Sequence, residues 1–335
     1  MKNSTNINVL VDGAGGDVGQ GVIKSLLASN LSITLYASCI TSTSSWLHKV
    51  DNSYVFPYIS SENFIEFLIS FLNKHQIAVY FPTVDSGILK IAQYKQLIEE
   101  KTNCIVFVDE LKKVRICDDK YETIVFLQEN GFNAPLSILP KDSLIQDFIA
   151  TVGYPFIVKT RSGYGANEVF LITKENDYKR FVNDMTYMFQ QYIPKEGGEY
   201  TSGIYLGDDN EIKGICTFKR ELRCGSTYKA ERIIDENLER PLRMIARKLG
   251  LKYLNIQSMK KGDSLYPFEF NGRFSGTTSM VSHVFNAPEM FIREKILKEK
   301  LVPSDNQKLF FVSRYAEEVY TTKEAIDALE QRSKL

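Results

Sequence analysis

Histidine, tryptophan and long apolar runs are scarce in this sequence of 335 residues, which contains three histidines and one tryptophan. No two of His48, His75 and His283 have the spacing of metal ligands, so a zinc site is not expected. No run of about 18 apolar residues is present, which argues against a transmembrane helix. The first residues are polar and lead straight into an apolar strand, which does not fit a signal peptide. We therefore expect a cytoplasmic protein with no membrane partner.

Charge and cysteine usage exclude further classes of protein. The 41 Lys and Arg residues balance the 41 Asp and Glu residues, so the net charge of zero does not favour nucleic acid as a partner. The five cysteines are scattered and form no C-x-x-C pair, which indicates free thiols in a reducing compartment. The 44% of hydrophobic and 24% of charged residues are typical of a globular protein.

The order of predicted elements indicates a mixed α/β protein. Over residues 7–108, short apolar runs alternate with segments of helix length, which predicts a parallel, doubly wound sheet. A helix is predicted over residues 178–185 from its pattern. Beyond residue 189 the chain becomes rich in strands, with two hairpins predicted over 200–219 and 254–270.

Gly13, Gly16 and Gly19 form the first glycine-rich turn, between a predicted strand and a predicted helix. Such a turn lets backbone N–H groups approach an anion at the helix N-terminus. The spacing resembles that of the extended short-chain dehydrogenases and nucleotide-sugar epimerases. A nucleotide-sugar oxidoreductase or epimerase is therefore one alternative for the function.

Two features of the sequence argue against that alternative. A dinucleotide site needs an acid after the second strand to bind the ribose, and residues 36–40 contain none. The dehydrogenase chemistry also needs a Tyr followed four residues later by a Lys, and none of the 18 tyrosines has one. We therefore interpret the turn as structural, with a place in the lining of a substrate cleft.

The second glycine-rich segment suits a polyphosphate. A predicted strand ends at Lys159, and Gly163 and Gly165 follow in a loop. A lysine charge and the backbone amides of a glycine turn are suitable ligands for nucleotide phosphates. Glycines also allow such a loop to close over its ligand. The spacing is not that of a Walker A loop, because no G-K-[ST] follows.

Glu269 and Asn271 are candidate metal ligands. Residues two apart on a strand share a face, and Gln257, on the neighbouring predicted strand, could join them. Oxygen ligands on a rigid hairpin suit Mg²⁺ that bridges nucleotide phosphates. Arg273, close by, is a candidate for binding phosphate or a developing anion. Further back in the chain, residues 189–199 have the composition of a linker whose backbone could bind an adenine edge.

The order of these segments resembles that of the ATP-grasp superfamily. It is most similar to the stand-alone carbamoyl-phosphate-synthase-large-subunit-like and pyrrolysine-biosynthesis-ligase-like proteins. The resemblance implies an ATP-grasp fold, α/β and α+β, with three parts. Residues 1–115 would form a doubly wound pre-ATP-grasp domain, 116–188 a small lobe with the phosphate loop, and 189–335 a C-terminal lobe with the metal site.

The resemblance also implies roles for individual residues, with ATP and Mg²⁺ as cofactors. The nucleotide would be bound by Lys120, Lys159, Gly163, Gly165, Gln191, Tyr192, Ile193 and Glu199. The metal would be bound by Gln257, Glu269 and Asn271. Arg273 would stabilise an acyl phosphate, and Arg220 and Arg223 would bind the phosphate or an acidic substrate.

The function that follows from the resemblance is ATP-dependent carboxylate–amine ligation through an acyl phosphate, with release of ADP and phosphate. The substrates would be a small carboxylate (an amino acid or an acidic sugar) and an amine. The sequence leaves a homodimer open and does not name the substrates. A degenerate ATP-binding protein without ligase activity is the other alternative. It rests on three departures from the family pattern, which are Gln191 where Glu is usual, Thr160 where proline is common and Glu168 where glycine is common.

Overall fold

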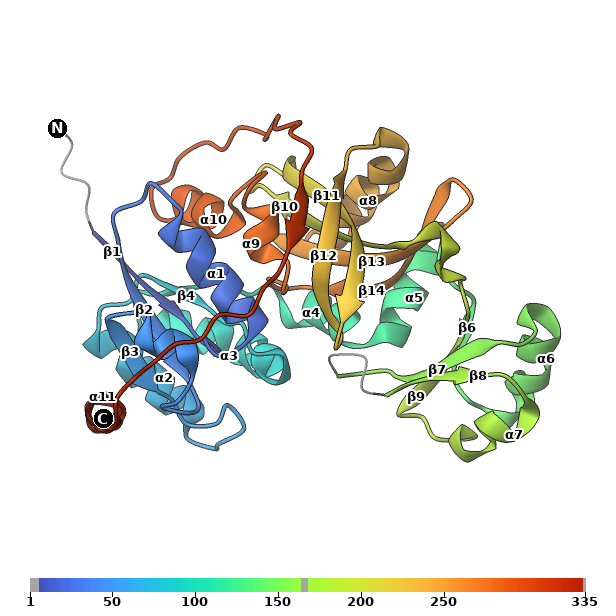
Figure 1. The fold of residues 1–335 in the computed structure, drawn as a ribbon, viewed down its shortest axis with the longest axis horizontal. Coiled ribbons are helices and arrows are strands. Elements are labelled where there is room, and N and C mark those ends of the chain that lie inside the picture. The colour runs from blue at the N-terminus through green and yellow to red at the C-terminus, as the bar shows by residue number, and fades with distance from the viewer. Residues whose placement is uncertain (1–5, 164–167, 334–335) are drawn as a thin grey trace.

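The computed structural model describes residues 6–163 and 168–333. These residues contain three β-sheets. In Figure 1 a five-stranded sheet lies at one end of the molecule, a six-stranded sheet in the middle and a four-stranded sheet at the other end. The architecture is mixed α/β, as the sequence predicts.

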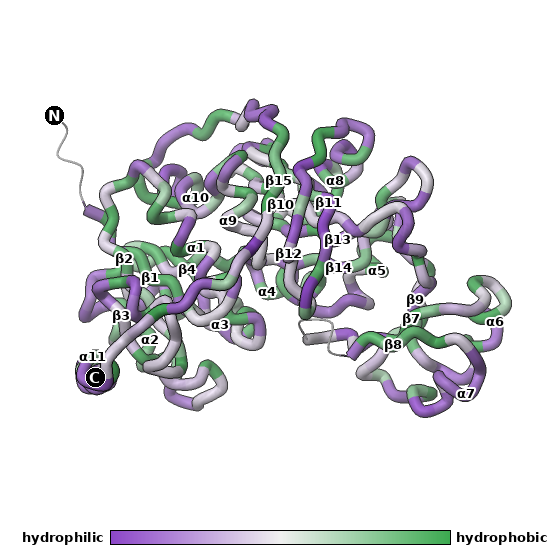
Figure 2. The backbone as a smooth tube through the Cα atoms, in the orientation of Figure 1, coloured by the Kyte–Doolittle hydropathy of each residue, from purple (hydrophilic) through white to green (hydrophobic). Residues whose placement is uncertain are grey.

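The five-stranded sheet is parallel and has the order β3-β2-β1-β4-β5. Its strands are β1 (Ile7–Val11), β2 (Ile33–Cys39), β3 (Asn52–Val55), β4 (Val79–Phe81) and β5 (Ile105–Val106). Helix α1 (Asp17–Leu27) packs on one face, while α2 (Phe64–Lys74) and α3 (Ile88–Lys101) pack on the other. The predicted doubly wound sheet is confirmed, and strands β1, β2 and β4 are largely hydrophobic in Figure 2 because both faces are covered.

Two short helices lead out of this sheet, α4 (Leu111–Asp118) and α5 (Lys120–Glu129). Helix α5 lies in the range predicted for the small lobe, but its buried residues Ile124 and Leu127 pack into the core of the six-stranded sheet. The lobe boundaries derived from the sequence remain a proposal.

The four-stranded sheet is antiparallel, has the order β6-β9-β7-β8 and possesses a core of its own. Its elements are β6 (Ser137–Ile138), α6 (Asp142–Val152), β7 (Phe156–Thr160), β8 (Val169–Ile172), α7 (Glu175–Tyr178) and β9 (Tyr187–Gln191). The core includes Phe148, Phe156 and Phe189. The helix predicted over 178–185 is wrong, since α7 ends at Tyr178, a 3₁₀ turn ends at Phe181, and Asn183 has a φ of 63°.

The six-stranded sheet is antiparallel with the order β14-β13-β10-β11-β12-β15. Its strands are β10 (Glu199–Leu206), β11 (Ile212–Arg223), β12 (Ser226–Ile233), β13 (Tyr253–Lys261), β14 (Ser264–Asn271) and β15 (Phe311–Ser313). Helix α8 (Glu236–Leu249) shares one core with it. A second core joins the sheet to α1 through α9 (Thr278–Val281) and α10 (Ala287–Lys295).

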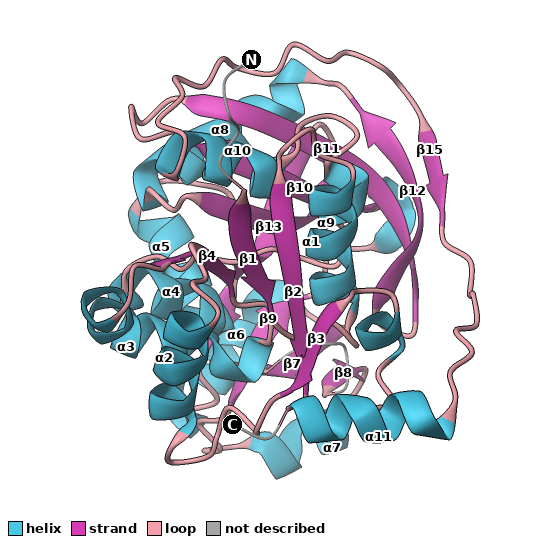
Figure 3. Ribbon diagram, turned by 90° about the vertical axis from the view of Figure 1, so that its left-hand side faces the viewer, coloured by secondary structure: helices cyan, strands magenta, loops and turns pink. Residues whose placement is uncertain are grey.

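The last part of the chain returns to the first sheet. After β15 it runs along the molecule to α11 (Lys323–Arg332), which packs beside β3 (Figure 3). Ser333 Oγ accepts a hydrogen bond from Val55 N at 2.7 Å, and Glu330 Oε1 accepts one from Ser42 Oγ at 2.6 Å. Residues 314–333 therefore form a strap across the first sheet.

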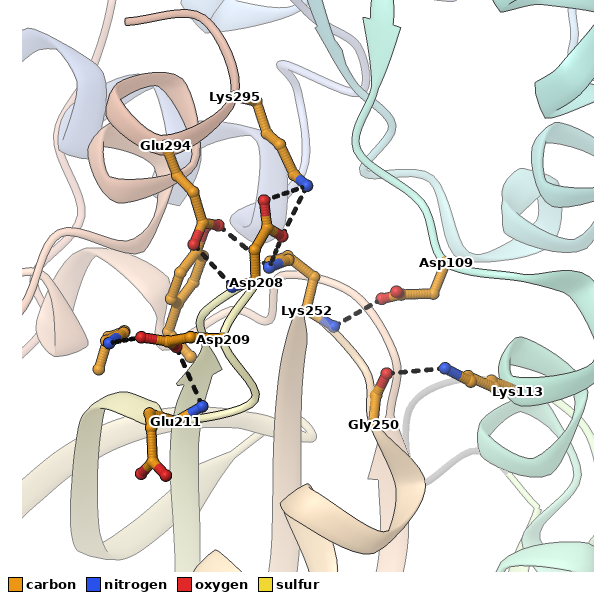
Figure 4. Close-up of polar contacts among 11 residues, drawn as sticks. Asp109, Lys113, Asp208, Asp209, Glu211, Gly250, Lys252, Glu294 and Lys295 are labelled. Atoms are coloured by element: carbon orange, nitrogen blue, oxygen red, sulfur yellow. Dashed lines mark hydrogen bonds and ion pairs between the residues drawn. The ribbon is translucent and has the colours of Figure 1, made fainter. Parts of the chain in front are cut away.

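A polar network ties the first sheet to the six-stranded sheet (Figure 4). Lys252 Nζ donates to Asp208 at 2.6 Å and to Glu294 at 3.0 Å, and Lys295 also pairs with Asp208. The backbone N of Lys252 donates to the carboxylate of Asp109, which follows β5. Burial raises the pKa of Asp109. Because these groups come from four segments, the network fixes the two sheets relative to each other.

Among the described residues, none of the helices has the length and apolar character needed to cross a membrane.

Candidate active site

A cavity of about 1020 Å³ lies where the three sheets approach one another. Its walls come from the carboxyl ends of β1, β2 and β4, the junction of α4 and α5, and the strands β10 to β14. Seven of the residues singled out from the sequence line it, namely Lys120, Gly163, Arg220, Gln257, Glu269, Asn271 and Arg273. Folding thus brings half of the predicted site residues together from segments that are far apart in sequence.

The predicted metal ligands lie along one wall of the cavity. Gln257 is paired across the strands with Glu269, and Asn255 with Asn271. All four line the cavity, and Asn271 Nδ2 donates to Asn255 Oδ1 at 3.4 Å. A ladder of one carboxylate and three amides therefore faces the cavity from β13 and β14.

This donor set fits Mg²⁺ when phosphates are also present. Mg²⁺ uses one or two carboxylates together with waters and substrate phosphates, rather than a complete cage of protein ligands. Glu269 supplies the carboxylate and Asn271 a carbonyl oxygen. Gln257 is less free, because its Oε1 accepts a hydrogen bond from Arg220 at 2.8 Å. Across residues 6–163 and 168–333, no cluster of three His, Cys, Asp or Glu offers an alternative site.

Lys120 joins the phosphate loop to the rest of the site. It is the first residue of α5, which Asp119 caps by accepting from the backbone N of Tyr121. Its Nζ donates to the carbonyl of Gly163 at 2.8 Å, and its backbone N donates to the carbonyl of Arg161. Gly165 lies outside the described residues. The start of α5 and residues 161–163 therefore hold each other in place.

Lys159 lies deeper than Lys120 and is not in the cavity lining. It points from β7 toward β14, where its Nζ donates to the carbonyl of Phe268 at 3.4 Å. Burial lowers the pKa of Lys159 to about 8, although the nearby carboxylate of Glu269 acts in the opposite direction. Among the described residues, this buried ammonium has one carbonyl partner, so it is well suited to gain a phosphate oxygen.

Arg220 lies between Gln257, a predicted metal ligand, and Glu199, the last residue of the predicted linker. Its guanidinium donates to Glu199 Oε1 at 2.6 Å, to Gln257 Oε1 at 2.8 Å and to Thr227 Oγ1 at 3.4 Å. Glu199, which the resemblance predicts to bind the nucleotide, is therefore held by Arg220 and does not itself line the cavity. Glu199 Oε2 has no part in these bonds.

Arg223 and the linker residues are not brought to the cavity. Arg223 is exposed beside the β11–β12 turn, with its guanidinium over the ring of Tyr228. Gln191, at the end of β9, exchanges hydrogen bonds with the backbone of Leu136. Tyr192 and Ile193 follow it without lining the cavity. Glu168 is exposed.

Arg273 has a carboxylate partner that the sequence analysis did not assign to the site. Its guanidinium pairs with Asp85, which follows β4, and also donates to the carbonyl of Phe274. Both Arg273 and Asp85 line the cavity. The carboxyl ends of parallel strands meet at one edge of a sheet, and this rule could have identified Asp85.

Two more charged residues of the lining had no clear signal in the sequence. Asp118 ends α4, and burial raises its pKa. Arg314 comes from the strap and donates to Asp17 at 2.8 Å and to the carbonyl of Gly276. Arg314 lies far beyond the other basic residues of the lining in the sequence, which are Lys120, Arg220 and Arg273, so only folding brings it there.

The first glycine-rich turn contributes to the cavity lining, as expected. Gly13, Gly16 and Gly19 all line it. A Cβ on Gly19 would lie 2.3 Å from the carbonyl oxygen of Gly13, so only glycine allows α1 to start this close to the turn. The turn therefore needs its glycines for packing.

Comparison with known proteins agrees with the geometry. Residues 117–277 match the family described as the ATP-grasp domain. The carbamoyl-phosphate synthase of Methanobrevibacter smithii is 24% identical over 210 residues, which are 58% of this chain and 56% of that protein. The chain thus spans little more than half the length of this curated relative.

Solved structures share the fold. N5-carboxyaminoimidazole synthetase from Staphylococcus aureus complexed with ADP superposes with a TM-score of 0.72 at 17% identity, over 92% of this chain and 83% of that one. The biotin carboxylase domain of the Hydrogenobacter thermophilus 2-oxoglutarate carboxylase, in complex with MgADP and bicarbonate, has a TM-score of 0.68 at 17% identity over 89% and 71% of the two chains. The chain therefore carries an ATP-grasp domain, over residues 117–277, and has the fold of the ATP-grasp ligases.

Proposed function

We propose that this protein is an ATP-dependent ligase that joins a small carboxylate to an amine through an acyl phosphate, releasing ADP and phosphate. The observation that carries the proposal is the meeting of Lys120, Arg220, Glu269, Asn271 and Arg273 in one cavity. Two anions, the carboxylate and the γ-phosphate, must approach each other in such a reaction, so cations have to be fixed in advance.

The chemistry divides into two balanced steps. A carboxylate oxygen attacks the γ-phosphorus, the bond to ADP breaks, and an acyl phosphate forms. The amine nitrogen then attacks the carbonyl carbon, phosphate leaves with the electron pair of the C–O bond, and the nitrogen loses a proton. Neither step needs a side-chain nucleophile.

The roles of the residues follow from their positions. Lys120 and Lys159 bind nucleotide phosphates from two directions, since Lys120 contacts the carbonyl of Gly163 whereas Lys159 lies buried on β7. Glu269 and Asn271 hold Mg²⁺, which when bound neutralises phosphate charge. Arg273, oriented by Asp85, stabilises the charge on the transferred phosphoryl group. Arg220 orients Gln257 and Glu199 on the same wall.

The relatives support the proposal without deciding it. ADP occupies the Staphylococcus aureus synthetase, and MgADP occupies the biotin carboxylase domain. Both proteins share the fold of this chain, and its cavity offers residues suited to the same nucleotide.

Isotope transfer tests the mechanism. A carboxylate labelled with ¹⁸O passes one label to inorganic phosphate if an acyl phosphate forms, and we expect this in every turnover that requires both substrates. Production of AMP and pyrophosphate, or unlabelled phosphate, would reject the acyl-phosphate route. MgATP binding without turnover for any pair of substrates would favour the degenerate ATP-binding protein.

A further inference from the structure

We propose that the end of the cavity beside the first sheet binds the carboxylate substrate, and that this substrate carries an uncharged, branched aliphatic or aromatic group. This inference rests on the proposed ligase function and narrows its substrate. Amino acids with apolar side chains are favoured over acidic sugars and phosphorylated acids.

The topology of the first sheet places a crevice at this end. Strand β1 is followed through α1 by β2 on one side, whereas β4 lies on its other side. Connections that leave in opposite directions open a crevice at the carboxyl ends of the two central strands. Gly13, after β1, and Thr83, after β4, line the cavity there, and the side-chain oxygen of Thr83 lies 2.6 Å from where a Cβ on Gly13 would be.

The lining of this end is mostly apolar. We call Ile40, Tyr58, Ile59, Phe64, Ile88 and Leu89 the apolar wall, and all six line the cavity. Phe64 and Ile88 are buried members of the core between the sheet and helices α2 and α3, and Ile59 and Leu89 pack against them. Ile40 and Tyr58, by contrast, are 46% and 62% exposed. An apolar ligand would remove this surface from water.

The wall is held in shape before any ligand binds. Lys90 Nζ donates to the carbonyls of Ile59 and Ser61, both at 2.8 Å, which fixes the loop after β3 to helix α3. A Cβ on Gly87 would lie 1.9 Å from Ile59 Cδ1, so Ile59 packs directly over the glycine. Preformed apolar pockets of this kind are typical of small-molecule sites.

The charges near the wall disfavour an anionic substituent. Between residues 12 and 114, the lining contains the acids Asp12, Asp17 and Asp85 and no lysine or arginine. Arg273 and Arg314 reach this region from later segments, but each is already paired, with Asp85 and Asp17 respectively. A second carboxylate or a phosphate on the substrate would therefore meet acids without a free counter-charge.

The carboxylate of the substrate must point away from the apolar wall, toward the charged end of the cavity. It has to reach the γ-phosphate near Glu269 and Arg273, so the rest of the molecule extends toward the first sheet. A compact apolar group beside the acid satisfies both ends of the cavity, because the charged end takes the carboxylate and the apolar wall takes the side chain.

Binding of matched acids to the protein saturated with MgADP tests the inference. Leucine, asparagine and aspartate have side chains of similar shape and different polarity, and 4-methylpentanoate and succinate repeat the contrast without an amino group. By calorimetry we expect the apolar member of each set to bind at least about 10-fold more tightly. Equal or tighter binding of the polar members, or no binding of any of the five, overturns the inference.

Variants locate the site. Ile40→Asp and Tyr58→Asp change exposed residues of the wall, and we expect each to abolish the preference while MgADP binding stays unchanged. Leu27→Asp is the matched control, because Leu27 is 60% exposed on α1 and outside the cavity. Preference retained in both wall variants also overturns the inference.

Hydroxylamine separates this inference from the ligase function, since it traps acyl phosphates as hydroxamates in place of the unknown amine. If leucine or 4-methylpentanoate binds with the expected preference but yields no hydroxamate, the ligase function fails and the apolar site stands. If hydroxamate forms only with polar acids, the ligase function stands and the apolar site fails.

Discussion

Charged and amide side chains crowd the cavity beside β13 and β14, whereas apolar side chains dominate the end beside the first sheet. The two ends also differ in how their residues are held. Arg220 and Lys120 are fixed by hydrogen bonds to named partners, while the apolar wall is fixed by packing over a core. The charged end suits chemistry shared by many substrates, and the apolar end suits the selection of one.

The charged end should be the more sensitive to substitution. We expect Glu269→Gln to lower kcat roughly 10²–10³-fold. The substitution removes the single carboxylate on β14, which should weaken the binding of Mg²⁺ beside the phosphoryl group that is transferred. Release of ADP at saturating Mg²⁺ measures the effect. Asp263→Asn, at the exposed turn of the same hairpin, is the control and should leave kcat unchanged. Equal activity in the two variants would reject the metal site.

The polar network of Figure 4 fixes the first sheet relative to the six-stranded sheet, so it should keep the two ends of the cavity aligned. Glu294 accepts from Tyr205, from the backbone of Asp208 and from Lys252. We expect Glu294→Ala to lower the free energy of unfolding by about 3 kcal/mol, because it leaves Lys252 with one partner fewer in a largely buried place.

An ion pair at the surface serves as the control for this measurement of the free energy of unfolding. Glu299 pairs with Arg293 at 2.9 Å where both side chains are partly exposed. Glu299→Ala should cost less than about 1 kcal/mol. Urea titration of both variants measures the difference, and equal losses would show that the network does not hold the sheets together.

The low pKa of Lys159 should make the binding of MgATP at the charged end depend on pH. Its pKa in the folded protein is lowered to about 8 from 10.5, so the ammonium form is present below about pH 8 and is lost above it. We expect MgATP affinity to fall as pH rises from about 7 to about 9, and Lys159→Met to bind roughly 10-fold more weakly near pH 7. Calorimetry at both pH values measures this.

The same lowered pKa has a consequence for stability. The folded protein binds fewer protons than the unfolded chain between about pH 8 and 10.5, so the contribution of Lys159 to stability rises with pH in that window. In Lys159→Met both pH dependences should vanish, whereas Lys74→Met, at the exposed end of α2, should keep them. A pH dependence that survives in Lys159→Met would assign it to another group.

Arg314 connects the two ends of the cavity, and its substitution should have the smallest effect on stability. It connects the strap to Asp17 at the first sheet and to Gly276 beyond β14. Because the pair with Asp17 is partly exposed, Arg314→Ala should cost less than about 1 kcal/mol of stability. Thermal unfolding measures this, with Arg332→Ala on α11 for comparison. A larger loss would mean that the strap is part of the cooperative core.

The sequence alone determined the doubly wound sheet and which side chains share the face of the proposed metal site, since both depend on local periodicity. The alternation of apolar strands and helices predicts the first sheet, and the two-residue repeat of a strand predicts that Glu269 and Asn271 share a face. Their pairing opposite Gln257 and Asn255 needed only a hairpin with the observed register.

Only the tertiary structure decided which charges pair and where the apolar end of the cavity lies. Asp85 meets Arg273 across 188 residues and Asp17 meets Arg314 across 297. Arg223, close to Arg220 in sequence, stays outside because it lies at the exposed end of its strand. The apolar wall has no motif, since its residues belong to three separate segments. Local patterns report which face a side chain occupies, but long-range contacts depend on how the sheets pack against one another.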